Sequence, residues 1–517
     1  MGGGLLQLVA YGAQDAYITG NPHITFWKVL YKRHTNFAME AFRVNFTGAP
    51  QYGQRVVAVI NRNADLMYKT YLEVQLPDTY SAADGDGVKW TGAYERRLGY
   101  QLLKKIEVEI GGQIIDTHYG EWLFLWENLT SGFDNSVKLD SMTGGYLGGT
   151  ETSAVSCGGR PAVLYIPLQF WFCRNPGLAL PLIALQYHEV RINVTLNPAT
   201  DLVSGTAGTA GSVSTAAAKL PQLKDMSLYV DYVYLDVDER RRFAQQSHEY
   251  LIDQLQFGLQ QTLTTASARI DLTLNHPVKE LVWVFQDARK TDCGSDLTKN
   301  MGFTQPFSYD DIVNRCRLQI NGQDRFDERY GDYFWKVQPY QHHSGGAFWP
   351  VRGQTTYTSG TTASATCSVV GDVLTADSPV TGFIVEGATV TGTGIAPGTI
   401  IAAYGTGNGK DGTYKLSEPA LTNDTGLSIT FTNPNINFAP HENPINVYSF
   451  ALQPEEHQPS GTCNFSRIDT TTLVFDSIAT TGIAKPTKST PFNFRMYAVN
   501  YNIFRVMSGM GGLAYSN

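Results

Sequence analysis

The sequence predicts an all-β protein made of two copies of one domain, with a further small β domain inserted in the second copy. Three observations predict it: a composition rich in turn formers and aromatics, a motif that occurs twice, and unequal spacing between repeated markers. The 517 residues include 50 Gly and 23 Pro, aromatic residues make up 12%, and charged residues make up only 17%. Such a composition is typical of a folded chain with many turns, and not of a disordered one.

The repeated motif reads IEVEIGGQIIDTHYGEW at residues 106–122 and CRLQINGQDRFDERYGDY at residues 316–333. In each copy apolar residues alternate, a Gly-Gln pair follows, and then come an Asp, a Tyr-Gly pair and an acidic residue. Alternation with a period of two that leads into glycine predicts a half-buried strand entering a turn. A motif repeated at this distance indicates a duplicated domain.

A second repeated marker, a pair of prolines separated by four residues, locates an insertion. Gly112 and Gly322 lie 210 residues apart, whereas Pro176 and Pro454 lie 278 residues apart, so the second half holds about 68 extra residues between the markers. Residues 355–433 are rich in Thr, Gly and Ser and contain short apolar stretches broken by glycine turns. We expect a small folded β domain there, because exposed loops tolerate insertions best; a disordered loop is the alternative.

The elements follow in the same order in both halves. The first residues, up to 24, mix a glycine run with apolar residues and lack the period of a barrel strand, so we expect an arm that lies along a neighbouring surface. A short helix is expected at 120–129. Strands are expected at 37–45, 55–61, 67–76, 106–110, 162–172, 187–196 and 226–237, and then at 251–263, 269–274, 280–286, 316–320, 447–452, 462–467, 471–475 and 492–506.

The sequence offers little that predicts chemistry. His342 and His343 form a pair that could hold a metal in a loop, but we expect polar surface residues. The acidic residues of the motif, such as Asp116 and Asp327, could suggest a carboxylate pair, yet duplicated positions in two domains lie far apart. No nucleophile elbow, zinc-protease motif, phosphate loop or dinucleotide fingerprint occurs. We therefore expect no enzyme: no catalytic, cofactor-binding or metal-binding residue.

Charge and hydropathy narrow the partners further. A net charge of −8 gives no overall attraction to nucleic acid or to anionic lipid. The most apolar run, residues 178–185, is too short to span a bilayer, so no transmembrane segment is expected. The first ten residues lack the features of a secretory signal, and no CxxC pair occurs among the six cysteines. We expect reduced thiols and a chain that is not secreted.

Long ungapped stretches resemble a known family. They include GGGLLQLVAYGAQDAYITGNPHITFWKVLYKRHTNFAME at 2–40, the motif at 106–123, CRNPGLALPLIALQYHEVRINV at 173–194, YFWKVQPYQHH at 333–343 and INVYSFALQPEEHQPSGTCNFSRID at 445–469. With the closing FRMYAVNYNIFRVMSGMGGLAY, these resemble the major capsid proteins of nucleocytoplasmic large DNA viruses. The similarity covers nearly the whole chain outside 355–433.

The resemblance implies a double jelly roll, with two consecutive eight-stranded barrels. We accordingly expect an arm at 1–24, a first jelly roll at 25–240 and a second at 241–517, interrupted by the surface β domain at 355–433. The implied function is structural: three chains form a pseudo-hexagonal capsomer that tiles an icosahedral shell. The implied partners are further copies and neighbouring capsomers, with the arm near minor capsid proteins and an internal membrane. The implied location is the virion, assembled in the host cell cytoplasm.

Other functions remain open from the sequence. A minor or vertex capsid protein would share the fold. A host-attachment protein would bind glycans through 355–433, which the resemblance places on the outer face. An enzyme on a β-sandwich would need a His, acid and nucleophile set that the chain does not offer.

Overall fold

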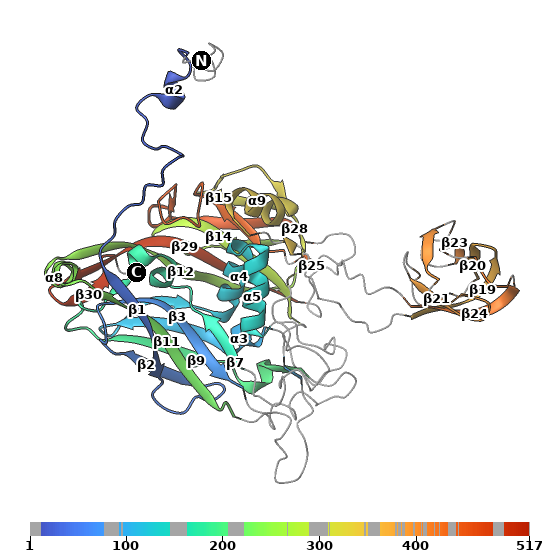
Figure 1. Cartoon of the computed structure of the whole chain (residues 1–517), viewed down its shortest axis with the longest axis horizontal. Helices are drawn as coiled ribbons and strands as arrows, with labels where there is room; N and C mark the ends of the chain where they lie inside the picture. The colour runs from blue at the N-terminus through green and yellow to red at the C-terminus, as the bar shows by residue number, and fades with distance from the viewer. Residues whose placement is uncertain are drawn as a thin grey trace, which may run out of the picture.

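A computed structural model gives the architecture of the chain (Figure 1). It describes residues 12–76, 93–94, 97–144, 163–204, 222–265, 267–288, 309, 311–345, 348–349, 362–377, 380, 384, 388–396, 399–404, 406, 411–417, 419–422, 424–432, 441–442, 444–478 and 491–515.

The first barrel consists of two antiparallel sheets with the strand orders β1-β11-β3-β7 and β2-β9-β5-β6. Each strand alternates apolar residues toward the space between the sheets, so the two inner faces build one core. The strands are β1 (Phe37–Asn45), β2 (Arg55–Ile60), β3 (Leu66–Gln75), β5 (Leu103–Ile110), β6 (Gln113–His118), β7 (Val163–Pro167), β9 (Val190–Leu196) and β11 (Asp225–Leu235).

The second barrel repeats this topology with the orders β12-β29-β14-β26 and β13-β28-β15-β16. If the strands of each barrel are counted in chain order, both barrels have the sheets 1-8-3-6 and 2-7-4-5. This arrangement is the eight-stranded jelly roll, so the predicted double jelly roll is confirmed. The strands are β12 (His248–Leu263), β13 (Ala268–Asp271), β14 (Pro277–Asp287), β15 (Val313–Ile320), β16 (Gln323–Asp324), β26 (Asn446–Ser449), β28 (Thr471–Ile478) and β29 (Phe492–Met507).

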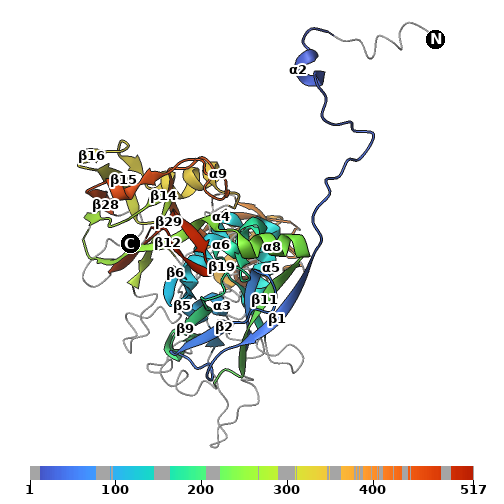
Figure 2. The ribbon, with the colours of Figure 1, turned by 90° about the vertical axis from the view of Figure 1, so that its left-hand side faces the viewer.

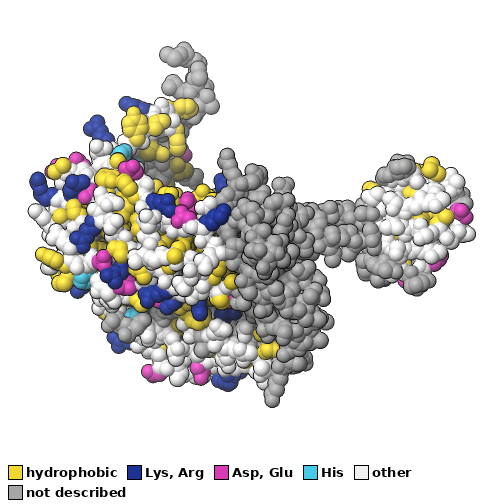
Figure 3. Space-filling view, turned by 90° about the horizontal axis from the view of Figure 1, so that it is seen from below, with side chains coloured by type: hydrophobic (Ala, Val, Ile, Leu, Met, Phe, Trp, Pro, Cys, Tyr) yellow, Lys and Arg dark blue, Asp and Glu magenta, His cyan; other side chains and the backbone are white. Residues whose placement is uncertain are grey.

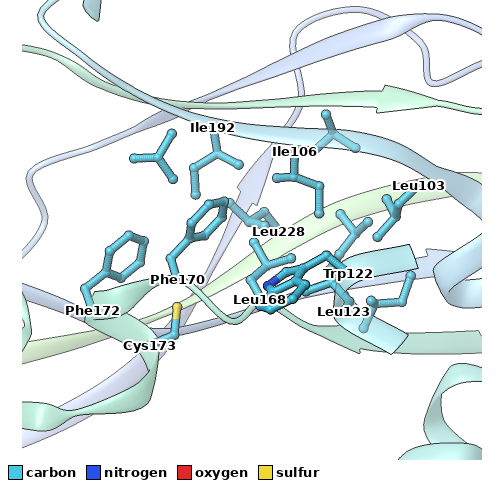
Figure 4. Close-up of a cluster of buried hydrophobic side chains, with 14 of the residues drawn as sticks. Leu103, Ile106, Trp122, Leu123, Leu168, Phe170, Phe172, Cys173, Ile192 and Leu228 are labelled. Carbon is cyan, nitrogen blue, oxygen red and sulfur yellow. The ribbon is translucent and has the colours of Figure 1, made fainter. Parts of the chain in front are cut away.

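The core of the first barrel is aromatic and aliphatic (Figure 4). Ile106 from β5, Ile192 from β9 and Leu228 from β11 meet Phe170 and Trp122, and all five are at most 3% exposed. Trp122 comes from α4, so the helix after β6 closes the space between the sheets and takes part in the core.

A small six-stranded sheet with the order β21-β24-β19-β20-β23-β22 lies within residues 355–433. Its apolar cluster, which includes Leu374, Val390 and Phe431, shares no residue with the clusters of the barrels. The sheet stands apart from the barrels (Figure 1), and few charged side chains appear on its described surface (Figure 3). The predicted inserted β domain is confirmed. Its strands are β19 (Thr362–Val370), β20 (Val373–Ala376), β21 (Thr389–Thr391), β22 (Ile401–Tyr404), β23 (Gly412–Leu416) and β24 (Asp424–Thr432).

The insertion enters the second barrel between its fifth and sixth strands, β16 and β26. A two-stranded ribbon forms its stem, in which Phe348 of β18 (Phe348–Trp349) pairs with Glu442 of β25 (His441–Glu442). In the first barrel the corresponding connection carries two helices, α4 (Gly120–Thr130) and α5 (Phe133–Thr143). The insertion therefore uses a connection that is long in both barrels.

Short elements complete the described chain. The helices are α2 (Ala16–Thr19), α3 (Leu98–Leu102), α6 (Trp171–Arg174), α8 (Val237–Gln245) and α9 (Gln338–His342), with 3-10 turns at Pro176–Leu178, Ala199–Asp201 and Phe465–Arg467 and a π-helical turn, η5, at Tyr333–Val337. The remaining strands are β4 (Ala93–Tyr94), β8 (Leu180–Pro181), β10 (Val203–Ser204), β17 (Arg329–Tyr330), β27 (Cys463–Asn464) and β30 (Met510–Leu513).

Several predicted strands extend beyond the observed ones, and two of them end at residues that explain the difference. The strand expected at 162–172 ends at Pro167, because proline offers no N–H to continue a ladder, and α6 follows. The strand expected at 462–467 ends at Asn464, whose side chain accepts a hydrogen bond from the Ser466 N–H and starts a 3-10 turn. The helix expected at 120–129 is α4.

The chain before β1 leaves the barrels as an extended arm (Figures 1 and 2). Its short helix α2 buries no residue. Phe26 is 88% exposed and Trp27 is 95% exposed, and Tyr17, Ile18, Ile24, Val29, Leu30 and Tyr31 are exposed as well. Residues 1–11 of the expected arm lie outside the described residues.

Candidate functional site: the contact between the two barrels

The repeated motif forms the same hairpin turn in both barrels. Gly111 and Gly112 have φ of 60° and 87°, and Asn321 and Gly322 have φ of 51° and 77°. Two consecutive residues with positive φ between paired strands define a type I′ turn, which favours glycine and asparagine. The first turn residue donates its N–H to the chain just before the seventh strand in each barrel, to Glu189 O at 3.0 Å and to Thr470 O at 2.8 Å.

The requirement for glycine in the Tyr-Gly pair of each motif also has a structural reason. A Cβ on Gly120 would lie 2.1 Å from the carbonyl oxygen of Tyr100, and a Cβ on Gly331 would lie 2.1 Å from that of Val313. Both glycines therefore let the chain pass directly against the beginning of the fourth strand. The prediction that the motif is a strand and turn marker, one per barrel, is confirmed.

The second barrel buries both faces of the sheet β12-β29-β14-β26. On β29, Phe494, Met496 and Ala498 belong to the barrel's own core. The intervening Tyr497 and Val499 point the other way and belong to the cluster that fills the first barrel. The two barrels therefore share a continuous apolar contact, formed by the outer face of this sheet and by β6, α4 and α6 of the first barrel.

Glu121, the acidic residue of the first motif, lies at the centre of this inter-barrel contact. Its carboxylate lies 2.6 Å from Nη2 of Arg495 and accepts hydrogen bonds from the hydroxyls of Tyr497 at 2.6 Å and Tyr309 at 3.0 Å. Burial alone lowers the pKa of Arg495, but Glu121 outweighs it and the net shift is upward. Burial and the charge of Glu121 raise the pKa of both tyrosines, which remain donors.

Asp116 makes a second polar link across the contact. Its Oδ1 accepts from the N–H of Thr117 at 2.9 Å and from the N–H of Leu255 in β12 at 3.1 Å, and its Oδ2 lies 3.1 Å from Nε2 of His118. Asp327, its counterpart in the second motif, is exposed. The duplicated carboxylates therefore do not form one acid–base pair.

A third polar group at the contact between the barrels is centred on His343. Its Nε2 lies 2.9 Å from Glu280 and its Nδ1 lies 2.9 Å from Glu455, and its side chain is fully buried. Burial alone lowers the pKa of His343, but the two carboxylates outweigh it and raise it to about 9. The following Ser344 and Gly345 bond to the carbonyls at the end of α4, Thr130 O at 2.9 Å and Leu129 O at 2.8 Å.

The surface position expected for His343 is therefore wrong. A glutamate at the start of a buried strand, as in KELVWVF at 279–285, was the available signal that a buried cation lies nearby. Among the described residues no group of His, Cys, Asp and Glu could hold a metal ion.

Asp253 of β12 pairs with one cation from each barrel, and the pair with Arg174 connects the two barrels. It lies 3.2 Å from Nζ of Lys279, which is 0% exposed, and 3.4 Å from Arg174 of α6 in the first barrel. Burial lowers the pKa of Lys279, while Asp253 opposes that shift. No local sequence pattern indicates this group, because its members lie on three separate elements.

The described part of the chain contains no helix long and apolar enough to cross a membrane. Its charged clusters are used for contacts between elements of the same chain. The polar groups around Glu121, Asp116, His343 and Asp253 can therefore hold the surfaces of the two barrels together.

Two jelly rolls in tandem, joined through a buried sheet face, define a double jelly-roll structural protein. Residues 25–236 match the family described as "Major capsid protein N-terminus", and residues 239–366 and 432–512 match the family described as "Large eukaryotic DNA virus major capsid protein". The chain belongs to the major capsid proteins of large eukaryotic DNA viruses. The interval between the last two matched stretches, 367–431, lies entirely within the insertion.

Similar proteins agree over the full length. The chain is 42% identical over 522 residues to the major capsid protein of Pyramimonas orientalis virus and 34% identical over 555 residues to that of Paramecium bursaria Chlorella virus 1, with 100% of each chain covered. Among solved structures, the quasi-atomic model of the PBCV-1 virus capsid aligns with a TM-score of 0.62 at 31% identity, covering 95% of this chain and 100% of that one. The Faustovirus major capsid protein, at 12% identity and a TM-score of 0.58, shows the shared fold.

The predicted class of function is thereby confirmed. The chain is a structural protein of the capsid shell of a large DNA virus, and its place is in the virion.

Proposed function

We propose that three copies of the chain associate into a pseudo-hexagonal capsomer and that these capsomers tile an icosahedral shell. The observation that carries the proposal is the contact within one chain, which joins two barrels of the same topology through unlike surfaces. A contact between unlike surfaces repeats from barrel to barrel and closes into a ring when its rotation allows. Three chains of two barrels would supply six barrels to such a ring.

The mass of the purified full chain in solution tests this proposal. We expect a stable particle of three chains by light scattering. A chain that stays monomeric at all concentrations, and does not form shells, would contradict it.

The division of the chain that goes with this function is an arm at 1–24, a first barrel at 25–240, a second at 241–517 and a surface domain at 355–433. It is supported by α8, which connects the last strand of the first barrel, β11, with the first strand of the second, β12. Limited proteolysis tests it: cleavage should occur first near residues 24, 355 and 433, while the two barrels stay together through their shared core.

The arm is proposed to bind beneath the shell, near minor capsid proteins and an internal membrane. Its row of exposed apolar side chains supports this role, because Phe26 and Trp27 have no contact with the barrels that would bury them. Deletion of residues 2–21 should leave the mass of the capsomer unchanged and prevent complete shells in electron micrographs. Normal shells from the deleted protein would disprove the role.

A second candidate function belongs to the insertion. Its separate core and its position apart from the barrels favour a module that contacts a host-surface glycan. A glycan array probed with the full chain and with a variant lacking 355–433 tests it, since binding should disappear with the insertion. If the chain were a minor or vertex protein instead, it would form a faint band in a gel of purified virions rather than the dominant one.

We further propose that this function needs no catalytic centre, no cofactor and no nucleic acid, and that assembly takes place in the host cell cytoplasm. The buried acidic groups support the first point, because Glu121, Asp116 and Glu280 are engaged with cations or backbone N–H groups of their own chain. A purified protein that hydrolysed glycan substrates would contradict it.

A further inference from the structure

The contact within one chain leaves two surfaces without a counterpart. The first barrel contributes β6 and α4, and the second contributes the outer face of β12-β29-β14-β26. Because the barrels share one topology, each barrel possesses both kinds of surface. One chain therefore has a free sheet face, on β1-β11-β3-β7 of the first barrel, and a free motif end, on β17, η5 and α9 of the second.

Near Leu66 and Val233 this sheet face is covered by Phe243 of α8, and elsewhere apolar side chains of β1 and β7 are exposed. On β1 and β7, Phe37 is 51% exposed, Met39 is 46% exposed and Tyr165 is 38% exposed. On the equivalent face of the second barrel, Val282 and Val284 of β14 are 0% exposed because the first barrel covers them. The outer face of this sheet is thus buried on β14 of the second barrel, whereas apolar side chains of β1 and β7 on the corresponding face of the first barrel are exposed.

Aromatic rings stiffen the middle of this face. Tyr229 of β11 alternates with Leu228 and Val230, which point into the core, and so lies on the outer side. Its ring stacks on Tyr71 of β3 with centroids 5.2 Å apart, and Tyr71 lies 6.2 Å from Tyr165. Tyrosine is enriched in the buried part of protein interfaces. We call Phe37, Met39, Tyr71, Tyr165 and Tyr229 the sheet surface.

The free motif end presents the matching elements. Tyr119 of the first motif packs across the inter-barrel contact, with its ring 5.2 Å from that of Phe257. Its counterpart Tyr330 is 63% exposed, and Tyr340 on α9 is 86% exposed. We call Tyr330, Val337 and Tyr340, which lie on β17, η5 and α9, the motif surface.

Tyr330 is held in place although it is exposed. The guanidinium of Arg315 lies 5.0 Å from the centre of its ring, and Arg315 in turn lies 3.0 Å from Glu328. An oriented ring loses little conformational entropy when a partner covers it. The exposed copy of the motif is therefore prepared for a contact like the one that the first copy makes.

The two surfaces do not cover each other within one chain, because residues of both are exposed. In both views α9, which carries part of the motif surface, lies above the strands β1 and β11, which carry part of the sheet surface (Figures 1 and 2). Each surface is therefore available to another molecule, and the contact already present in the chain indicates which molecule that is: a second copy, placed as the second barrel is placed on the first.

We propose that the motif surface of one copy packs on the sheet surface of the next copy, and that this contact between unlike surfaces closes the capsomer. The proposal rests on the trimer proposed above and names the residues that form its interface. It makes Tyr165 and Tyr330 interface residues that lie on opposite partners of each contact.

Two double variants and a control test the proposal in the full chain. The sheet variant carries Met39→Asp and Tyr165→Asp, and the motif variant carries Tyr330→Asp and Tyr340→Asp. Tyr515→Asp is the control, because Tyr515 is 60% exposed and belongs to neither surface. Masses are measured by light scattering, and circular dichroism with thermal melting verifies that each variant is folded.

The expected masses are three chains for the wild type and the control, and one chain for each double variant alone. An equimolar mixture of the two variants should give particles of two chains, because one intact motif surface and one intact sheet surface are then available for a single contact. If like surfaces paired instead, each variant alone would still form dimers, and the proposal would fail.

The experiment distinguishes a failure of the proposed trimer from a failure of the proposed interface. A wild-type chain that stays monomeric overturns the trimer and this interface together. A trimeric wild type whose folded double variants also stay trimeric overturns the interface alone, and so does a mixture that gives no particle of two chains.

Discussion

At the contact between the barrels, one carboxylate can bind several groups of the other barrel at once. Glu121 receives Arg495 and two tyrosine hydroxyls, and the side chains of Glu121 and Arg495 are 14% and 13% exposed. Removing one member of such a group leaves the other charge buried without a partner, which costs far more than an exposed pair is worth.

Glu121→Gln should lower the free energy of unfolding by about 3 kcal/mol, because the guanidinium of Arg495 then lacks a counter-charge in a buried site. Urea denaturation of wild type and variant measures the difference. The matched control is Glu249→Gln, which removes an exposed pair with Arg505 at 2.8 Å and should change stability by less than about 1 kcal/mol. Equal effects of both substitutions would contradict this account.

His343 predicts how stability depends on pH. Its pKa is raised from 6.5 to about 9, so the folded chain holds a proton that the unfolded chain releases in this range. The stabilisation is fully present below pH 6.5 and is lost as the pH rises through about 9, and it amounts to roughly 3 kcal/mol.

Urea midpoints at several pH values between 6 and 9.5 should therefore fall with pH in the wild type and fall less steeply in His343→Gln. His34→Gln, which changes an exposed histidine of the arm, should follow the wild type. Parallel curves for His343→Gln and the wild type would show that His343 does not carry the effect.

Glu127 is a buried carboxylic acid whose pKa is also raised. Burial raises its pKa to about 7, although Arg97 and the hydroxyl of Tyr100 oppose the shift. Its protonated form is favoured in the fold, so its contribution is present below pH 4.5 and is lost as the pH rises through about 7.

At the scale of elements, the hairpin with its following glycine is the unit that recurs. Gly120 and Gly331 allow the chain after the hairpin to touch the backbone of the fourth strand in each barrel. The backbone cannot yield as a side chain could, so the requirement for glycine is strict.

Gly120→Ala and Gly331→Ala should each destabilise the chain by about 3 kcal/mol or prevent folding, because the added methyl group would overlap a carbonyl oxygen. Gly132→Ala is the control: its φ is −67° and nothing lies within 4 Å of the added Cβ. Soluble yield and melting temperature check the series, and a stable Gly331→Ala protein would refute the packing argument.

The strands were largely predictable because one buried face imposes an alternation that the sequence displays. The partners of individual side chains were not, since Glu121 and Arg495 are 374 positions apart and no local pattern connects them. The run FNFRMYAVNYNIFRV at 492–506 did carry a signal, because apolar residues occupy both parities after Met496. That pattern is typical of a strand buried on both faces, which is the position of β29.

At the scale of the whole molecule, the described residues form two large apolar clusters in the barrels, one in the inserted domain and a small one around Leu66, Ala179 and Val233. The first cluster crosses from one barrel into the other, so the barrels unfold as coupled units. The cluster of the inserted domain shares no residue with it, and the β18–β25 ribbon holds the ends of the insertion side by side.

Replacement of 355–433 by a short Gly-Ser linker should leave the melting temperature of the barrels unchanged within about 2 °C, because the apolar cluster of the insertion's described residues is separate from those of the barrels and the stem already closes the loop. Differential scanning calorimetry measures it, and the wild type should show an additional transition from the inserted domain. A large drop in the barrel transition would show that the insertion supports the barrels.

The ribbon β18–β25, which forms the stem of the insertion, has a consequence for how the chain can evolve. Because the inserted domain and the barrels have separate apolar clusters, we expect a substitution in the core of one to leave the folding equilibrium of the other unchanged. Selection could therefore vary the inserted domain, or exchange it for another, while the barrels stay constant. The connection between β16 and β26 is thus a place where the chain can change without altering the cores of the barrels.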